Sequence, residues 1–205
     1  MTMIADPEQY FRNFIPPRDE ILRELEQEAK DERIPIVGPV VGELLFILAR
    51  AVRAQRILEL GTAIGYSAIY LAHGCEPAKG RVITLEWDEG MAARARSNIA
   101  KAGLSHLVEV QVGDAQKLMA DMTGGTFDLV FLDIDKEGYL PALAHCHRLL
   151  KTGGLLIADN VGFAGADPFN QGIMADRRWR AVSLLCFLPN HSPEKDGLAF
   201  AVKVA

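Results

Sequence analysis

The 205-residue sequence predicts an α/β fold, in which a mostly parallel β-sheet is covered by helices on both faces. The first observation is an alternation, between residues 56 and 159, of short apolar runs with longer segments whose apolar residues recur at helical spacing. This alternation is typical of parallel strands joined by right-handed crossover helices. The second observation is a pair of apolar runs near the end of the sequence joined only by a polar loop, which predicts an antiparallel pair at the sheet edge.

The first 52 residues are expected to form helices that precede the sheet. Residues 18–30 mix Leu and Ile with Glu and Arg at helical spacing, after Pro16 and Pro17. A second helix is predicted at 40–52, after Gly38 and Pro39. We expect these extra helices to form a lid or an oligomer surface.

The sheet itself is predicted to begin at residue 56. Its parallel strands are expected at 56–60, 81–86, 107–112, 127–133 and 154–159, and the intervening helices at 65–74, 89–102, 115–122 and 137–150. A loop at 162–168 that contains Gly and Pro then leads to a short helix near 169–177. The antiparallel strands are predicted at 180–187 and 197–203.

Composition and charge exclude several classes of protein. Apolar residues make up 49% of the chain, and its length suits a single domain with a substantial core. A net charge of −5 provides no basic surface for non-specific binding of nucleic acid, although one specific RNA contact stays open. Cys75, Cys146 and Cys186 are widely spaced, which predicts small buried hydrophobic side chains rather than a disulfide framework. The sequence shows neither a signal-peptide pattern nor a bilayer-length apolar run, so we expect a cytoplasmic protein.

Polar side chains follow two of the predicted strands at the point where each strand ends. Asp133 closes one strand, with Lys136 three residues later, and Asp159 and Asn160 close the next. Carboxylate and amide oxygens suit a hard divalent cation such as Mg²⁺, and Lys136 is then a candidate general base. The alternatives are that Asp133 caps the rim of the sheet, that Asp159 and Asn160 form a turn, and that Lys136 is a solvated lysine.

A loop that contains two glycines follows the first strand. Gly61 allows a tight turn, and Gly65 lets the next helix begin close to a ligand, where free amides would favour a polar or anionic group. The G-x-x-x-G spacing differs from the dinucleotide-binding fingerprint. Glu59 beside this loop would repel a pyrophosphate and suits the cationic end of an amino acid.

The ends of the second and third strands complete a candidate cofactor site. Glu86 ends the second strand, where a carboxylate can accept both hydroxyls of a ribose. Gly113, Asp114 and Ala115 end the third, where an adenine would meet a small residue and a carboxylate. Glu86 could instead be a solvated charge, and Asp114 could be only the N-cap of the next helix.

These motifs together resemble a known family, the cation-dependent O-methyltransferases of the catechol and caffeoyl-CoA type. The resemblance spans about residues 36–160 and rests on the segments 59–67, 113–115 and 133–136, on Glu86, and on Asp159 with Asn160. It implies a Rossmann-like sheet of seven strands whose last strand is antiparallel, and S-adenosylmethionine as cofactor. The residues that it places at the cofactor, with those argued above, are Val37, Glu59, Gly61, Thr62, Gly65, Tyr66, Ser67, Glu86, Asp114, Ala115, Asp133 and Asp135.

The resemblance also implies that three segments of the chain have different roles. Residues 1–52 would form a helical cap, 53–160 the core that binds cofactor and metal, and 161–205 the acceptor-side loop and C-terminal strands. Asp133, Asp159 and Asn160 would hold Mg²⁺ or a similar cation beside the hydroxyl of a small catechol-like or phenylpropanoid-like acceptor, and Lys136 would be the base. We expect a homodimer, the commonest symmetric assembly, and no membrane partner.

Three alternatives remain at this point. The acceptor could be a hydroxylated uridine in tRNA, which some relatives use and which the acidic balance disfavours. The chain could bind the cofactor without catalysis, which Asp133, Asp159, Asn160 and Lys136 argue against. A nicotinamide-dependent dehydrogenase is disfavoured by the glycine spacing.

The remaining residues are less informative about function. His145 and His147 are two positions apart on a predicted helix and face different sides, so zinc binding there is not expected. His73, His106 and His191 are expected at the surface or in loops. Tyr139 fits a packing role or a wall of the site equally well. The loops at 161–168 and 189–196 leave the identity of the acceptor open.

Overall fold

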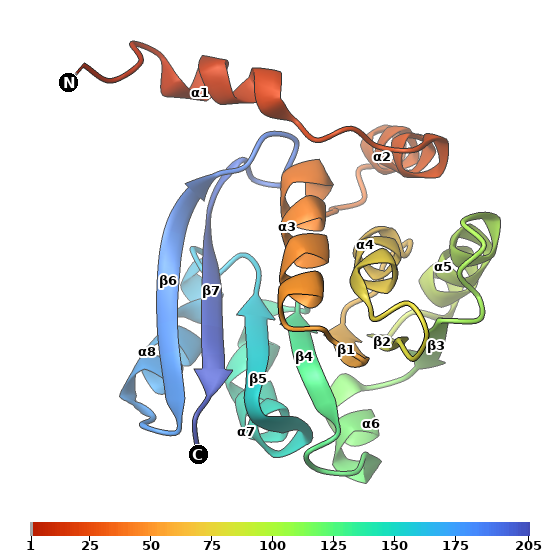
Figure 1. Ribbon diagram of the computed structural model, residues 1–205, viewed down its shortest axis with the longest axis vertical. Coiled ribbons are helices and arrows are strands. Elements are labelled where there is room, and N and C mark those ends of the chain that lie inside the picture. The colour runs from red at the N-terminus through yellow and green to blue at the C-terminus, as the bar shows by residue number, and fades with distance from the viewer. Residues whose placement is uncertain (1) are drawn as a thin grey trace.

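The computed structural model describes residues 2–205 and contains a seven-stranded sheet in the order β3-β2-β1-β4-β5-β7-β6 (Figure 1). The first five strands are parallel to one another, as the alternation predicted. The strands are β1 (Arg56–Leu60), β2 (Arg81–Glu86), β3 (Val108–Val112), β4 (Phe127–Leu132), β5 (Leu150–Ala158), β6 (Trp179–Phe187) and β7 (Lys195–Lys203).

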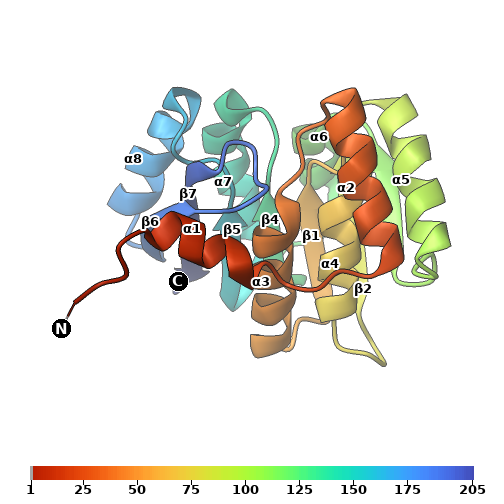
Figure 2. The same ribbon diagram turned by 90° about the horizontal axis from the view of Figure 1, so that it is seen from above.

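Helices cover both faces of the sheet (Figure 2). One layer contains α3, α4 and α5, with α2 lying outside them, and the other contains α6, α7 and α8. The helices are α1 (Pro7–Phe11), α2 (Glu20–Glu32), α3 (Gly38–Ala51), α4 (Tyr66–Gly74), α5 (Glu89–Lys101), α6 (Ala115–Asp121), α7 (Tyr139–Leu149) and α8 (Asp167–Ala175).

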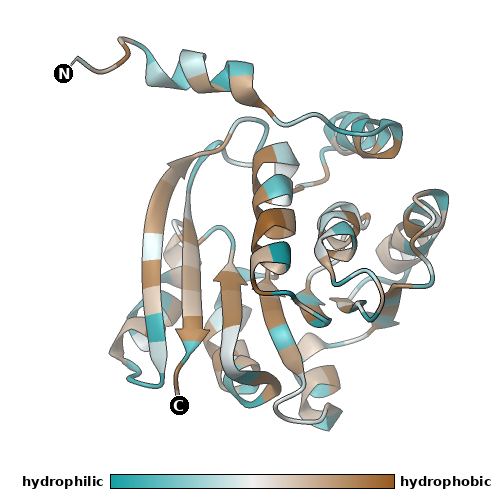
Figure 3. Ribbon diagram, in the orientation of Figure 1, coloured by the Kyte–Doolittle hydropathy of each residue, from teal (hydrophilic) through white to brown (hydrophobic). Residues whose placement is uncertain are grey.

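The strands bury apolar side chains on both of their faces, as a covered parallel sheet requires. Along β1, Ile57 packs into the core beneath α3, α4 and α5, whereas Leu58 and Leu60 pack into the core beneath α6, α7 and α8. The hydropathy colouring shows the central strands as brown arrows between the two helical layers (Figure 3). The two cores hold the strand ends rigidly, so that polar residues at those ends have defined positions.

The last two strands form the predicted antiparallel pair, and the structure shows which of them lies at the edge of the sheet. β7 lies between β5 and β6 and is antiparallel to both, with Ile157 opposite Phe200 and Val182 opposite the same residue. The connection between β6 and β7 is therefore carried to the edge of the sheet where the parallel strands end (Figure 1). That edge also carries Asp133 and Asp159, so residues near 190 and near 160 become neighbours.

Several predicted boundaries differ from the structure. β5 begins at Leu150, four residues earlier than the predicted start at residue 154, and ends at Ala158, so Asp159 lies just beyond it. Lys136 lies in a short 3₁₀ turn, Lys136–Gly138, that precedes α7. Helix α1 was not predicted, because five residues show no helical period and none of its side chains is buried.

The leading helices differ in how firmly they are packed. Helix α2 buries Leu22, Leu25 and Ala29 against α3 and its neighbours, whereas α1 buries no side chain. Cys75 and Cys146 are buried and Cys186 is half-buried, and each of the three is a free thiol. None of the helices within residues 2–205 has the length and apolarity that crossing a bilayer requires.

Candidate active site

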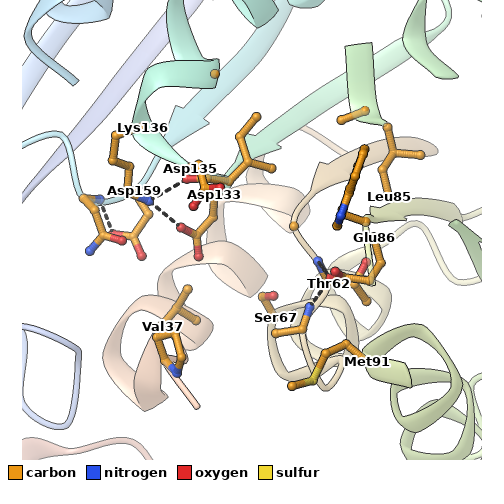
Figure 4. Close-up of a pocket in the computed structure, with 18 of the residues that line it drawn as sticks. Val37, Thr62, Ser67, Leu85, Glu86, Met91, Asp133, Asp135, Lys136 and Asp159 are labelled. Carbon is orange, nitrogen blue, oxygen red and sulfur yellow. Dashed lines mark hydrogen bonds and ion pairs between the residues drawn. The ribbon is translucent and has the colours of Figure 1, made fainter. Parts of the chain in front are cut away.

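A cavity of about 830 Å³ lies at the edge of the sheet where the parallel strands end. Figure 4 shows its two ends: Thr62, Glu86 and Met91 lie at one, and Lys136 and Asp159 at the other. This volume falls within the range typical of small-molecule sites. The predicted site residues that line it are Val37, Gly61, Thr62, Tyr66, Ser67, Glu86, Asp114, Ala115, Asp133, Asp135, Lys136, Asp159 and Asn160.

Two predicted cofactor residues, Glu59 and Gly65, lie behind the wall of the cavity rather than in it. Gly65 has φ +90° and forms the N-cap of α4, and a side chain there would meet Ala95 of α5. Gly61 has φ +94°, and a Cβ at that position would lie 1.9 Å from the carbonyl oxygen of Asp133. Gly61 therefore allows the end of β1 to approach the end of β4.

The loop after β1 is held by Glu86 at the end of β2. One Glu86 oxygen accepts hydrogen bonds from the amides of Thr62 (3.1 Å) and Ala63 (2.8 Å), and the other accepts one from Asp88 (2.9 Å). Two backbone amides of this loop are thus occupied within the protein. An ionised carboxylate has about four acceptor positions, so Glu86 keeps roughly one for a ribose hydroxyl.

Asp114 has both of the roles that the sequence left open. Its side chain caps α6 by accepting a hydrogen bond from the amide of Lys117 (3.0 Å), and it also lines the cavity. Ala115, next to it, adds a small apolar contact surface to the same wall.

Glu59 is a buried acid on β1, a central strand of the sheet. Its side chain is fully buried in β1, and neither carboxyl oxygen has a hydrogen-bond partner among residues 2–205. Burial raises the pKa of Glu59 to about 8, because an unpaired charge is costly away from water. The group is therefore mostly protonated at neutral pH in the ligand-free protein.

This burial predicts a pH-dependent effect of Glu59→Gln, because the amide resembles the protonated acid and cannot ionise. In the native protein the free energy of unfolding falls as the pH rises from the ordinary pKa of the acid towards about 8. The variant should lack this loss, so it should be more stable than the native protein at pH 8 by roughly 4 kcal/mol, since the pKa rises from 4.5 to about 8 and each unit is worth about 1.4 kcal/mol. Urea unfolding at pH 5, 6, 7 and 8 measures the difference.

The matched control for this experiment is Glu24→Gln, which alters an exposed carboxyl on α2. Its stability should follow that of the native protein at every pH. A Glu59→Gln variant that is less stable than the native protein at pH 8 would contradict the buried, protonated state.

At the other end of the cavity, Lys136 is surrounded by acceptors. Its Nζ donates to Asp133 Oδ1 (3.0 Å), to the Ile134 carbonyl (3.0 Å) and to the Tyr139 hydroxyl (2.9 Å). All three N–H bonds are used, so the side chain is an ammonium in this structure. Burial, with the charge of Asp159 next in importance, raises the pKa of Asp133 against the opposing effect of Lys136.

Tyr139 hydrogen-bonds to the amine of Lys136, and so has a role beyond packing. Its ring is fully buried against Phe169, and its hydroxyl contacts the carbonyls of Asp159 (2.9 Å) and Leu132 (3.2 Å). Burial, together with the charges of Asp133 and Asp159, raises the pKa of Tyr139 well above its usual value. Tyr139 is thus a neutral phenol that holds the ends of β4 and β5 and the amine of Lys136.

His191 was expected at the surface or in a loop, and its burial corrects that prediction. It does lie in the loop between β6 and β7, but its side chain is only 1% exposed. Its Nε2 lies 2.8 Å and 3.0 Å from the two carboxylate oxygens of Asp159. The loop was predicted and the burial was not, because the strand order brings residue 191 beside residue 159, and a single histidine in a polar loop carries no sign of this.

Asp196, near the start of β7, orients the side chain of Asn160. The Asn160 Nδ2 donates to Asp196 Oδ2 (2.6 Å), and Asp196 Oδ1 accepts from the amides of Gly162 (3.1 Å) and Gly197 (2.6 Å). The amide oxygen of Asn160 is consequently the atom left for a ligand. Asn160 has φ +49°, a conformation that Asn tolerates better than most residues.

The chemistry of these donors fits a divalent cation. Asp159 and Asp196 are buried, the side chain of Asp133 is 27% exposed, and Asp135 adds a fourth carboxylate whose charge reaches Tyr139. Lys136 forms an ion pair with Asp133, and the His191 ring is in direct contact with Asp159. No three His, Cys, Asp or Glu side chains within residues 2–205 converge on one metal position, so the amide oxygen of Asn160 is needed for a set of three.

The sequence missed other residues of the cavity as well as His191. Trp87, Met91, Ile134 and Phe163 line it, and each is adjacent or close in sequence to a predicted site residue. Trp87 directly follows Glu86 and is 74% exposed. Its place after a strand-end carboxylate was the only available signal.

The chain that forms this site is similar in sequence to known O-methyltransferases. A family model described as O-methyltransferase matches residues 16–180. A catechol O-methyltransferase of Mycobacterium tuberculosis is 44% identical over 120 residues, which cover 58% of this chain and 54% of that protein. One from Niastella koreensis is 41% identical over 128 residues, which cover 61% and 58%. The chain thus spans a little over half the length of these relatives.

The similarity extends to solved structures over almost the whole chain. The O-methyltransferase TomG of Streptomyces achromogenes, in complex with SAM, has a TM-score of 0.86 at 30% identity. The match covers 97% of this chain and 96% of that one. The seven-stranded sheet with its antiparallel β7 is therefore shared with a protein that holds SAM.

Proposed function

Because this chain belongs to the O-methyltransferase family, we propose that it transfers a methyl group from S-adenosylmethionine to a hydroxyl of a small catechol-like acceptor. The single observation that carries the proposal is one cavity with two chemically different ends. One end is lined by Glu86 and the glycine loop, and the other by Asp133, Asp159, Asn160 and Lys136.

The end near Glu86 supports binding of the methyl donor. Glu86 retains an acceptor position for a ribose hydroxyl, and Asp114 and Ala115 present a carboxylate and a small apolar surface to a base. Thr62 and Ser67 line the stretch between the two ends. These residues would hold S-adenosylmethionine, which would supply the methyl group.

The end near Asp159 supports binding of the acceptor through a divalent cation. We propose that Asp133, Asp159 and the amide oxygen of Asn160 hold the cation. A cation bound there would lower the pKa of a nearby hydroxyl. Asp133 and Asp159 also concentrate negative charge where the acceptor must lose a proton. Lys136, paired with Asp133, partly balances that negative charge.

Lys136 is proposed as the group that receives the proton of the acceptor hydroxyl. Tyr139 and the Ile134 carbonyl fix its amine beside Asp133. Since the amine is an ammonium here, it must release a proton before it can accept one. The remaining contribution of the site is to align the acceptor oxygen with the methyl carbon and sulfur, which is a large part of the rate enhancement in such reactions.

The test is methyl transfer from labelled S-adenosylmethionine to a panel of catechols, caffeoyl esters, flavonoids and tRNA, with Mg²⁺ present. We expect transfer to acceptors with two adjacent hydroxyls and none to the matched compounds with one hydroxyl. Transfer to tRNA alone would replace the proposed acceptor. Binding of S-adenosylmethionine without transfer to any member of the panel would contradict the proposed activity.

A further inference from the structure

The loop between β6 and β7 contributes a buried histidine to the proposed metal site. The loop is closed by backbone hydrogen bonds from Leu188 to Glu194 (2.7 Å) and from His191 to Leu188 (3.0 Å). The side chain of Glu194 accepts from the amide of Asn190 (3.0 Å) and pairs with Arg12. The loop is therefore a firm support for His191.

Both nitrogens of the His191 ring are used within the protein. The carbonyl oxygen of Pro193 lies 2.6 Å from Nδ1, and because a carbonyl can only accept, Nδ1 must carry a proton. Nε2 lies 2.8 Å and 3.0 Å from the two oxygens of Asp159, so the second ring nitrogen is held against that carboxylate. The Pro193 contact sets the orientation of the ring, and the ring then sets the orientation of the carboxylate.

The remaining acceptor capacity of Asp159 indicates where a cation would bind. Its Oδ1 also accepts from the amide of Asn160 (2.8 Å), so Oδ1 has two contacts within the protein, whereas Oδ2 has only the one to His191. The position that is left belongs to Oδ2. A metal bound through it needs no rearrangement of His191.

We infer that His191 is a positioning residue for the metal: it fixes the Asp159 carboxylate with one oxygen position open, while Asp196 does the same for Asn160. Both orienting residues come from the β6–β7 region, so this region, and not only the ends of β4 and β5, determines the affinity for the cation. The inference rests on the proposed function to the extent that a cation binds at Asp133, Asp159 and Asn160.

The test measures Mn²⁺ binding by calorimetry and by the electron paramagnetic resonance signal of free Mn²⁺, without any acceptor. We expect His191→Ala to weaken Mn²⁺ binding by about 10- to 100-fold, the range found for groups that orient metal ligands. His191→Gln should recover most of the affinity, because its Nε2 can donate from nearly the same position. Affinity for S-adenosylmethionine should stay within about twofold in both variants, since Glu86 and its loop are untouched.

The control variant is His106→Ala, which removes an exposed histidine from a turn outside the cavity and should leave Mn²⁺ binding unchanged. If His191→Ala does not fold, His191→Leu takes its place, since it fills the volume without a donor. Unchanged Mn²⁺ affinity in the folded Ala or Leu variant overturns the inference, and so does a Gln variant that binds as weakly as that variant.

The outcomes separate this inference from the proposed function. If the Mn²⁺ results hold but no acceptor is methylated, the proposed activity fails and the role of His191 stands. If transfer occurs but the native protein binds no Mn²⁺, the role of His191 at a metal fails and the activity stands.

Discussion

EDTA is expected to abolish methyl transfer to catechol, and Mg²⁺ in excess is expected to restore it. Asp133 and Asp159 place two carboxylates, the second of them buried, at one end of the cavity, and the amide oxygen of Asn160 lies beside them. A bound cation contributes several kcal/mol of charge stabilisation to such reactions, so its removal should slow transfer by about 10³-fold or more. Initial rates with labelled S-adenosylmethionine, before and after dialysis against EDTA, measure this effect.

Binding of S-adenosylmethionine is the control for the EDTA experiment. It should persist in EDTA, because Glu86, Asp114 and the glycine loop are held by contacts within the protein. Full turnover in EDTA would contradict the metal site. It would indicate instead that Lys136 and His191, which already pair with Asp133 and Asp159, supply the positive charge that the reaction needs.

Lys136→Ala is expected to lower kcat by about 10²- to 10⁴-fold, the usual contribution of a general acid or base. Among residues 2–205 the amine is the only side-chain nitrogen hydrogen-bonded to Asp133, and it is fixed there by Tyr139 and the Ile134 carbonyl. Rates with saturating catechol and Mg²⁺ measure the change. The affinity for S-adenosylmethionine, measured by calorimetry, should remain nearly unchanged.

Lys136→Arg separates proton transfer from charge at the same position. Arginine keeps the positive charge beside Asp133 but does not release a proton in proteins. If Lys136 is the base, this variant should be about as slow as Lys136→Ala. Recovery of most of the turnover would show that the positive charge is what matters, and unaltered turnover in Lys136→Ala would remove Lys136 from the mechanism.

The elements of the core could be predicted because their signals are local. Strands β1 and β2 were predicted with the observed bounds, since each is an apolar run of strand length between polar turns. Asp133, Asp159 and Asn160 stood out because a carboxylate or amide that interrupts an apolar strand marks the rim of a sheet. The antiparallel end was equally readable, because two strands joined by one polar loop can pair directly.

Other features had no local signal. Glu59 was predicted to contact the cofactor, and the structure adds that its side chain is fully buried and that burial raises its pKa to about 8. Glu86 was predicted to accept ribose hydroxyls, and the structure adds that it holds the amides of Thr62 and Ala63. Both outcomes depend on which neighbour each side chain meets, and sequence spacing does not state this.

The sequence by itself determined the kind of fold, the order of the strands along the chain and the donor set at two strand ends, because each follows from a short run of residues. Only the tertiary structure decided how those donors are oriented. Insertion of β7 between β5 and β6 carries His191 and Asp196 to Asp159 and Asn160, across 32 and 36 residues of sequence. Contacts over such a separation are set by sheet order and packing, and no periodicity in the chain encodes them.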